Sequence, residues 1–260
     1  PAKEVLTILP DHRELVECLL DFDVIGFQTK SYALAFLDYV IRELGGVVEP
    51  NGFVYALGKR VLVKNFPISI DTLGFQALAK QSDESSHVKR LLKSLGEANF
   101  IIGVDRLDYS KGIISRFKSY ERFLYSYPEH QGNVMFMQIA PTSRGEVKQY
   151  QQIRHDLESE AGHINGAYSD FDWQPVRYLN KSFSRQVLAG FFRRSRIGLV
   201  TPFRDGMNLV AKEFVAAQDI DDPGVLILSR FAGAAEEMDG ALIVNPYDLD
   251  GMADAMNIAL

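Results

Sequence analysis

The stretch that decides the fold reads FIIGVDRLDYSKG and covers residues 100–112. Its first five residues form a short apolar run typical of a buried strand, and a charged loop then leads through Gly112 into a helical pattern. The same order recurs where the apolar residues 197–200 precede residues 201–213, TPFRDGMNLVAKE. Ligands of open parallel sheets bind just beyond the carboxyl ends of the strands, so both loops are candidate ligand sites.

Strand and helix patterns alternate without a break from about residue 100 onward. Near-continuous apolar strands separated by amphipathic helices predict a parallel sheet covered on both faces. Six such units form a complete Rossmann-type α/β domain. The six apolar runs are residues 100–104, 134–140, 176–179, 197–200, 225–228 and 241–244.

The sequence before residue 95 is less regular. A polar, serine-rich stretch at residues 80–86 predicts a domain boundary, which divides the chain into residues 1–85 and 86–260. The chain begins without an initiator Met and stops inside an amphipathic pattern, so we interpret it as a fragment whose first part is the tail of a preceding domain. In that part we expect helices at residues 15–20 and 31–44 and strands at residues 24–27, 61–63 and 66–70.

Composition excludes several classes of protein. The 260 residues are 47% hydrophobic and carry a net charge of -6, which argues against a general nucleic-acid binder. No apolar run reaches the roughly 18 residues of a membrane span, and no secretory signal is visible. Cys18 is the only cysteine, so no intrachain disulfide is predicted and a reducing cytoplasm is the expected location. No dinucleotide fingerprint, nucleophile elbow or metal-ligand cluster occurs, so we predict no cofactor and no metal.

The first loop carries Arg106 and Lys111, with Asp105 and Asp108 close by. Arg grips two phosphate oxygens at once and Lys adds a compact charge, so the pair suits a diphosphate. The alternative is a solvated, salt-bridged loop. It is not a P-loop, because Lys111 lacks the glycine before it and the Ser or Thr after it that such a loop requires.

The second loop joins a helix start to two carboxylates. Gly206 and Asn208 begin the helix, whose amides and positive dipole end favour an anion. Asp205 and Glu213 lie eight residues apart, which is about two helical turns. One carboxylate suits sugar hydroxyls at the loop and the other suits ribose hydroxyls along the helix. The alternative for Glu213 is a plain exposed helix residue.

Two further loops follow predicted strands. Arg144, within residues 140–145 (APTSRG), suits a second anion such as a sugar phosphate, or it caps or salt-bridges its loop. The small-residue loop at residues 231–236 (FAGAAE) either lets backbone amides approach a ligand or forms a tight turn.

These residues resemble the trehalose-6-phosphate synthase family, the retaining glycosyltransferases of family 20, in their bacterial form. The resemblance covers essentially the whole chain, and five motifs occur in the family's order. It implies a GT-B fold with a complete C-terminal Rossmann-like domain, the donor domain, and the tail of the N-terminal, acceptor-side Rossmann-like domain. The motifs are residues 26–29, 106–112, 138–145, 204–213 and 243–247.

The resemblance implies UDP-glucose as donor and glucose 6-phosphate as acceptor, with no nucleic acid and no membrane partner. Arg106 and Lys111 match the ligands of the donor diphosphate, and Arg144 matches a ligand of the acceptor phosphate. Asp205 matches the contact to the donor glucose, so the matched catalytic residues are Arg106, Lys111 and Asp205. The other matched donor-binding residues are Phe183, through its backbone to uracil, Gly206, Met207, Asn208, Leu209 and Val210, through their amides, and Glu213, through the ribose.

The resemblance also implies a front-face transfer without metal, in which the departing phosphate deprotonates the acceptor hydroxyl. The family's upstream glycine-rich loop and active-site His are not in this chain, so we expect it to be inactive alone. The sequence allows a homo-oligomer without specifying one, and it does not distinguish UDP from GDP or ADP. The alternatives are a glucosylglycerol-phosphate synthase or pseudo-glycosyltransferase of the same family, a non-catalytic sugar-nucleotide-binding module and a nucleotide-sugar epimerase.

Overall fold

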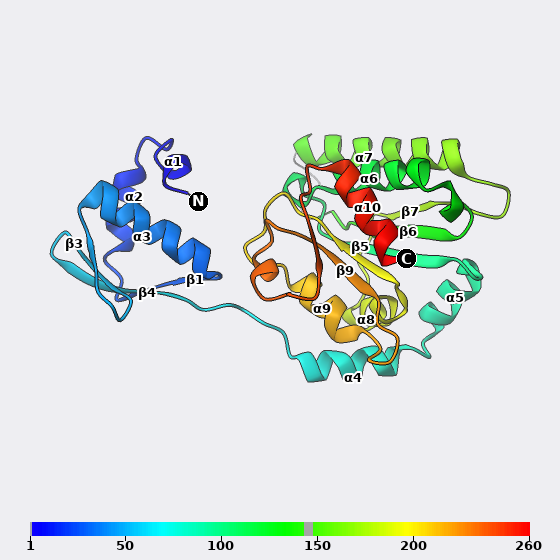
Figure 1. The fold of residues 1–260 in the computed structure, drawn as a ribbon, viewed down its shortest axis with the longest axis horizontal. Helices are drawn as coiled ribbons and strands as arrows, with labels where there is room; N and C mark the ends of the chain where they lie inside the picture. Colours follow the sequence, from blue (N-terminus) through cyan, green and yellow to red (C-terminus); the bar gives the residue numbers. More distant parts are fainter. Residues whose placement is uncertain (1, 143–147) are drawn as a thin grey trace. The chain divides into compact units, whose positions relative to one another are not determined.

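The computed structural model describes residues 2–142 and 148–260, which form two compact units, Pro1–Ile68 and Ser69–Leu260 (Figure 1). The division lies at a different place from the boundary expected after residue 85. Helix α4 (Thr72–Ser82) belongs to the second unit because Phe75 and Ala79 are buried in that unit's core. The polar stretch at residues 80–86 instead links α4 to α5 (Ser86–Leu95), with Ser85 as the N-cap of α5.

The first unit is a small α/β layer with a four-stranded sheet. The strand order is β1-β4-β3-β2; β1 pairs with β4 in parallel and the other neighbours are antiparallel. Its core lies between the sheet and α3, where Tyr39 and Val40 are fully buried. The elements are α1 (Lys3–Leu6), α2 (His12–Leu19), β1 (Val24–Phe27), α3 (Lys30–Leu44), β2 (Val47–Val48), β3 (Phe53–Ala56) and β4 (Lys59–Asn65).

The expected strand at residues 66–70 is wrong. The partner strand β1 ends at Phe27, so the ladder stops after the Phe66 amide donates to the Phe27 carbonyl oxygen at 2.7 Å. The Ile68 amide then donates to a side chain, Gln28 Oε1, at 2.9 Å. The hairpin of β2 and β3 was not expected from the sequence.

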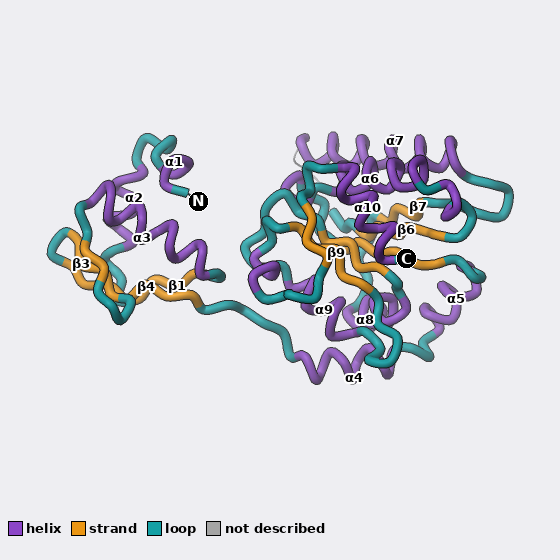
Figure 2. The backbone as a smooth tube through the Cα atoms, in the orientation of Figure 1, coloured by secondary structure: helices purple, strands orange, loops and turns teal. Residues whose placement is uncertain are grey.

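The second unit contains the six-stranded parallel sheet that the sequence predicts (Figure 2). All six apolar runs form strands, and the spatial order is β10-β9-β8-β5-β6-β7. This is the doubly wound order of a Rossmann-type sheet. The strands are β5 (Asn99–Val104), β6 (Val134–Ile139), β7 (Val176–Leu179), β8 (Ile197–Val200), β9 (Val225–Ser229) and β10 (Leu242–Val244).

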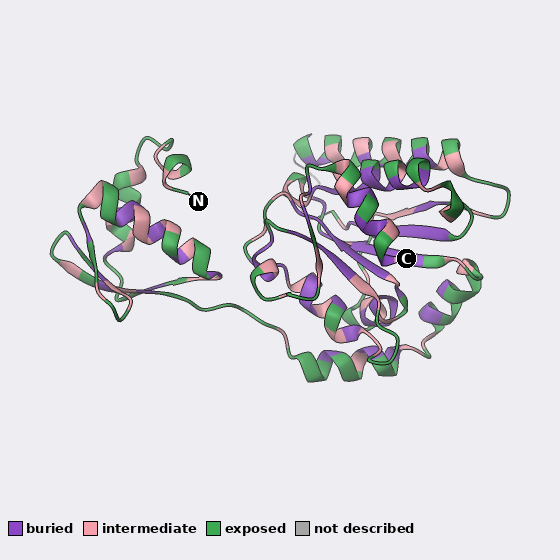
Figure 3. Cartoon of the chain, in the orientation of Figure 1, coloured by how far each residue is buried: buried purple, intermediate pink, exposed green. Residues whose placement is uncertain are grey.

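Helices cover both faces of this sheet (Figure 1). Alternation along β5 shows why, since Ile101 packs into one core while Phe100 and Ile102 pack into the other. The central strands β6 and β8 are accordingly wholly buried, whereas the edge strands β7 and β10 are only partly buried (Figure 3). One face carries α6 (Ile113–Ser126), α7 (Lys148–Tyr168) and α10 (Leu249–Ala259), and the other carries α4, α5, α8 (Arg185–Arg194) and α9 (Leu209–Ala217). Among the described helices, none is long and apolar enough to cross a membrane.

Candidate functional site

The order of the strands brings two loops together at the carboxyl edge of the sheet. The chain moves outward from β5 through β6 to β7 and then returns to the other side of β5 with β8. The loops after β5 and β8 therefore lie at the switch point, which is the position of the ligand-binding crevice in open α/β sheets. The two loops touch, because the Phe203 amide donates a hydrogen bond to the Ser110 carbonyl oxygen at 2.8 Å.

The first loop turns sharply into helix α6. Asp108 precedes a 3-10 turn, η1 (Tyr109–Lys111), and accepts a hydrogen bond from the Ser110 amide at 2.8 Å. Gly112 follows with a φ of 64°, a left-handed conformation that disfavours residues with a Cβ. A Cβ at this position would also lie 2.7 Å from the Thr201 carbonyl oxygen in the second loop. Glycine is therefore what allows the two loops to approach this closely.

Lys111 and Asp205 form an ion pair across the two loops. Lys111 Nζ lies 2.5 Å from Asp205 Oδ2, and the side chains are 15% and 18% exposed. The Asn208 side-chain amide also donates to Asp205 Oδ2, at 3.1 Å. A lysine ammonium has three donor hydrogens, so one carboxylate partner leaves capacity for a second anion. The structure thus brings together two predicted site residues that are 94 positions apart.

Arg106 lies in the exposed part of the first loop. Its positive charge lowers the pKa of the neighbouring Asp108 carboxyl. Burial raises the pKa of Asp108, but hydrogen bonds from Ser110 and the charges of Lys111 and Arg106 outweigh it and leave that pKa below its usual value. Two cations therefore lie in one short loop with an ionised carboxylate that orders the loop.

Beneath the first loop, the fully buried side chain of Arg116 connects three strand ends. Its Nη1 donates to Asp105 Oδ2 at 2.6 Å and to Gln138 Oε1 at 2.8 Å, and its Nε donates to Thr201 Oγ1 at 3.0 Å. Its Nη2 donates to the Lys111 carbonyl oxygen at 3.4 Å. Burial raises the pKa of Asp105, and the charges of Arg116 and Lys111 act against that rise. A buried ion is tolerated only when paired and hydrogen-bonded, so this network is a specific support for both loops.

The second loop opens helix α9. Asn208 has a φ of 77°, and its side-chain oxygen accepts a hydrogen bond from the Ala211 amide at 3.0 Å. This N-cap starts the helix at Leu209. The first amides of a helix have no partner within it, and the positive end of the helix dipole lies beside them. The helix start therefore favours an anion beside the two loops.

The small-residue loop after β9 holds the second loop through its backbone. The Asp205 amide donates to the Phe231 carbonyl oxygen at 3.1 Å, and the Gly233 amide donates to the Asp205 carbonyl oxygen at 3.1 Å. The Ala234 amide, in the 3-10 turn η3 (Gly233–Glu236), donates to the Met207 carbonyl oxygen at 2.7 Å. The five amides of residues 231–235 are thus used within the protein, which favours the tight-turn alternative over direct ligand contact.

Aromatic side chains tie the C-terminal motif, residues 243–247, to the same loops. The rings of Phe203 and Tyr247 stack with centroids 4.6 Å apart, and Phe231 packs edge-on to Tyr247 at 6.2 Å. The Ser115 hydroxyl donates to the Pro246 carbonyl oxygen at 2.8 Å. Phe203 and Tyr247 also line a pocket of about 410 Å³ beside the first loop.

Glu213 lies further along α9 and is not a plain exposed helix residue. Its side chain is 21% exposed, and its Oε1 lies 3.4 Å from Nε of Arg185 at the start of α8. Burial raises the pKa of Glu213, and the charge and hydrogen bond of Arg185 lower it in part. Phe183 lies just before α8, with its ring 5.9 Å from that of Phe191.

Two further predictions about the site concern Arg144 and metal binding. Arg144, the predicted ligand of an acceptor phosphate, lies outside the described residues. Within residues 2–142 and 148–260, no group of three or more His, Cys, Asp or Glu side chains could hold a metal ion.

Sequence reasoning missed Arg116 and Arg185. A signal for Arg116 was present, because it lies on the same helix face as the apolar Ile113, Phe117 and Tyr120. An arginine on a buried face indicates a charged partner in the core. For Arg185 there was no such signal, since its contact with Glu213 depends on how α8 packs against α9.

The sheet order and the two loops at its switch point define a doubly wound α/β protein whose carboxyl edge carries a cation and a helix N-terminus that favour an anion. Comparison with known proteins identifies the family within this class. The model of glycosyltransferase family 20 matches residues 1–260, and the chain belongs to that family. The expected GT-B fold class is confirmed by the solved structures that the chain matches.

The chain is similar to trehalose-phosphate synthases. The chain is 51% identical over 262 aligned residues to the trehalose-6-phosphate synthase of Salmonella choleraesuis (strain SC-B67), covering 100% of this chain and 55% of that protein. An α,α-trehalose-phosphate synthase structure from Burkholderia xenovorans in complex with glucose-6-phosphate is 48% identical with a TM-score of 0.97, covering 100% of this chain and 58% of the other. An E. coli structure bound with UDP-2-fluoro glucose is 46% identical with a TM-score of 0.94, covering 100% of this chain and 57% of the other. The chain therefore spans little more than half the length of the relatives it matches.

Proposed function

We propose that this chain supplies the donor-binding part of an α,α-trehalose-6-phosphate synthase, which transfers glucose from UDP-glucose to glucose 6-phosphate with retention. The observation that carries the proposal is the Lys111–Asp205 pair at the switch point, beside the N-terminus of α9. Relatives with this name and a solved structure bound with UDP-2-fluoro glucose support it.

The donor diphosphate would meet Arg106, Lys111 and the amides of residues 206–210. Departure of the diphosphate concentrates negative charge on its oxygens while the sugar becomes oxocarbenium-like. Cations and helix amides already aimed at that charge stabilise the transition state more than the bound donor, which is how binding lowers a barrier. The buried Arg116 network fixes the Lys111 backbone, so little reorganisation is needed as the charge develops.

Asp205 and Glu213 would bind the two sugars of the donor. The Asp205 carboxylate, held by Lys111 and Asn208, would accept hydrogen bonds from glucose hydroxyls. Glu213 would accept from the ribose hydroxyls, and the backbone at Phe183 would contact uracil. Glucose 6-phosphate would bind through Arg144 and residues outside this site. The departing phosphate would then accept the proton of the attacking acceptor hydroxyl, without a metal.

Calorimetric titration with UDP-glucose tests the donor site. We expect the wild-type chain to bind and the Arg106→Ala and Glu213→Ala variants to lose about tenfold or more in affinity, the cost of a lost hydrogen bond to a charged group. Arg122→Ala is the matched control, because Arg122 is an exposed arginine that pairs with Asp250 away from the two loops. GDP-glucose and ADP-glucose, titrated in parallel, determine which base is preferred. No binding of any of the three by folded wild-type chain would contradict the proposal.

A further inference from the structure

Three side chains from three helices of the second unit form a stack beside the proposed nucleotide site. The Phe75 ring comes from α4, the Arg185 guanidinium from α8 and the Glu213 carboxylate from α9. The guanidinium carbon lies 4.8 Å from the centroid of the Phe75 ring, and Nε lies 3.4 Å from Glu213 Oε1. Phe75 is 1% exposed, so the base of the stack is anchored in the core.

This arrangement fixes a side chain that would otherwise be mobile. Arginine has several rotatable bonds, and an isolated pair with an exposed arginine contributes little. A guanidinium that also lies over an aromatic ring gains cation–π attraction and has fewer accessible rotamers. The Arg185 side chain is 57% exposed, so much of it is free to move in solvent. Packing on the Phe75 ring restricts its rotamers.

We propose that Arg185, seated on Phe75, is a positioning residue that holds the Glu213 carboxylate in place for the vicinal hydroxyls of a nucleoside diphosphate sugar. The inference rests on the proposed function, since it takes Glu213 as the ribose ligand. It adds a feature that neither the sequence motif nor the helix pattern indicates. Glu213, the proposed ribose ligand on α9, is oriented by a residue of the neighbouring helix α8.

The electrostatics around Glu213 agree with this geometry. Burial raises the pKa of Glu213, which favours the neutral acid, a poorer acceptor for two hydroxyls, and Arg185 opposes that rise. Helix α4 contributes the uncharged Phe75 ring to the stack. On α9 itself, Lys212 is paired with Glu237 at 2.6 Å, a carboxylate that follows η3. Arg185 is thus the cation that keeps Glu213 ionised toward lower pH.

The experiment measures Glu213 directly and then through the ligand. Carbon-13 NMR of labelled glutamate carboxyls gives the Glu213 titration midpoint, with the Glu213→Gln spectrum identifying its signal. Calorimetry from pH 5 to pH 8 gives affinities for UDP-glucose and for its 2′-deoxyribose analogue. UDP-glucose suits this range because its diphosphate is a diester that does not titrate there. The variants are Arg185→Met, Arg185→Lys and Phe75→Leu.

We expect Arg185→Met to move the Glu213 midpoint to higher pH and to weaken UDP-glucose binding at neutral pH by about tenfold, as for a lost hydrogen bond to a charged group. The loss of affinity with falling pH should begin at higher pH than in wild type. Arg185→Lys should restore the midpoint in part, because it keeps the charge but not the planar fork, and Phe75→Leu should fall between wild type and Arg185→Met. The deoxy analogue should bind wild type and Arg185→Met with similar affinity.

Two outcomes would overturn the inference in distinguishable ways. If Glu213→Gln loses the preference for UDP-glucose over the deoxy analogue while Arg185→Met keeps the wild-type midpoint and pH profile, only the positioning role is wrong. If Glu213→Gln binds both ligands as wild type does, Glu213 is not the ribose ligand, and the proposed donor site loses that residue together with the inference. Wild-type circular dichroism and cooperative unfolding well above the titration conditions show that the variants are folded, so a change in binding is not a loss of fold.

Discussion

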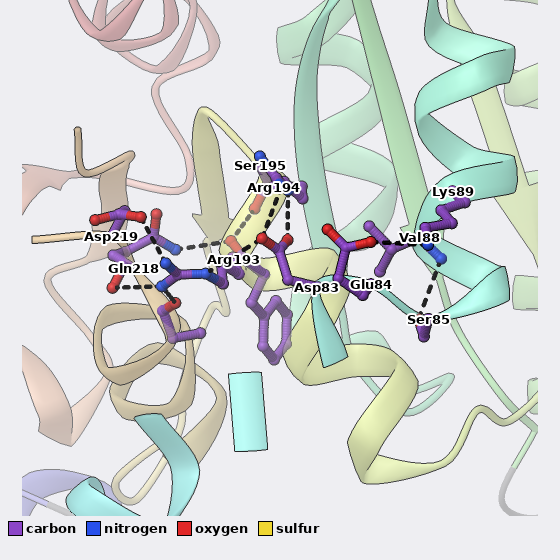
Figure 4. Close-up of polar contacts among 12 residues, drawn as sticks. Asp83, Glu84, Ser85, Val88, Lys89, Arg193, Arg194, Ser195, Gln218 and Asp219 are labelled. Carbon is purple, nitrogen blue, oxygen red and sulfur yellow. Dashed lines mark hydrogen bonds and ion pairs between the residues drawn. The ribbon is translucent and has the colours of Figure 1, made fainter. Parts of the chain in front are cut away.

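The two edges of the six-stranded sheet use charged residues differently. At the amino edge, where α8 and α9 end, the charges satisfy one another (Figure 4). Arg194 makes two hydrogen bonds to the Asp83 carboxylate, at 2.5 and 2.6 Å. Arg193 donates to Asp219 at 2.5 Å and to the last carbonyl oxygens of α9 at 3.4 Å. Both arginines thus pair with a carboxylate, and Arg193 also caps the C-terminus of α9, so both stabilise the fold.

At the carboxyl edge, the charged groups keep hydrogen-bond donors for which the described residues supply no partner. Among residues 2–142 and 148–260, Lys111 has one carboxylate partner, and the exposed Arg106 lies in the same loop. The positive end of α9 opens beside them, where the first helical amides point out of the helix. A cluster of arginines and aspartates is therefore no sign of a binding site by itself. Donor capacity that the protein leaves unused is the better indication, and substitutions can test this difference.

The largest effect is expected beneath the carboxyl edge, at Arg116. Arg116→Met leaves Asp105 buried without its cation, and breaking a buried pair by removing one partner costs about 3–5 kcal/mol. At the amino edge, Arg194→Met breaks a pair whose arginine is 41% exposed and should cost about 1 kcal/mol or less. Urea unfolding measures both. The double variant Arg116→Met/Asp105→Asn should recover part of the loss; equal losses in the single variants would erase the contrast between buried and exposed pairs.

Replacing one cation at each edge by methionine distinguishes an effect on ligand binding from an effect on stability. Lys111→Met should weaken UDP-glucose binding by about 1.5–3 kcal/mol, because it removes a charged hydrogen-bond donor, and should change stability little. Arg193→Met should do the reverse, since it removes bonds to a helix end and to Asp219 while leaving the loops of the carboxyl edge intact. Calorimetry and urea unfolding of both variants provide the comparison. A loss of donor affinity in Arg193→Met would mean that the amino edge also serves the ligand.

Gly112 tests how closely the two loops must approach. Gly112→Ala places a Cβ in a left-handed conformation, at a cost of roughly 1–2 kcal/mol, and against the Thr201 carbonyl oxygen. Gly45→Ala is the matched control, because Gly45 has the same left-handed conformation, with a φ of 66°, but nothing lies within 4 Å of the added Cβ. Both variants should lose stability, while only Gly112→Ala should lose UDP-glucose affinity. Equal affinities would show that the contact between the loops is not needed for binding.

Much of the fold, and the two charged loops at the strand ends, could be predicted from the sequence, because both depend on local patterns. Apolar runs separated by amphipathic helices gave all six strands of the second unit, and strand ends indicated the loops of Lys111 and Asp205. The unit boundary was not predicted, since the buried face of α4 shows only against α8 and α9. The partners of Arg116 and Arg185 lie on other elements, so no spacing along the chain reveals them.

The smallest expected effect is the loss of stability caused by ionisation of Glu213, the proposed ribose ligand. The pKa of Glu213 is raised because burial disfavours the carboxylate, so the folded chain binds this proton more tightly than the unfolded chain does. Ionisation at neutral pH therefore costs stability, and the cost is absent below the unfolded pKa and grows as pH rises through the folded one. Glu213→Gln carries no charge and should unfold at a slightly higher urea concentration than wild type at pH 7, with the difference vanishing near pH 4. The same variant should bind UDP-glucose more weakly. A variant that is less stable at pH 7 would show that the pair with Arg185 outweighs the burial cost, and that this carboxylate resembles those of the amino edge.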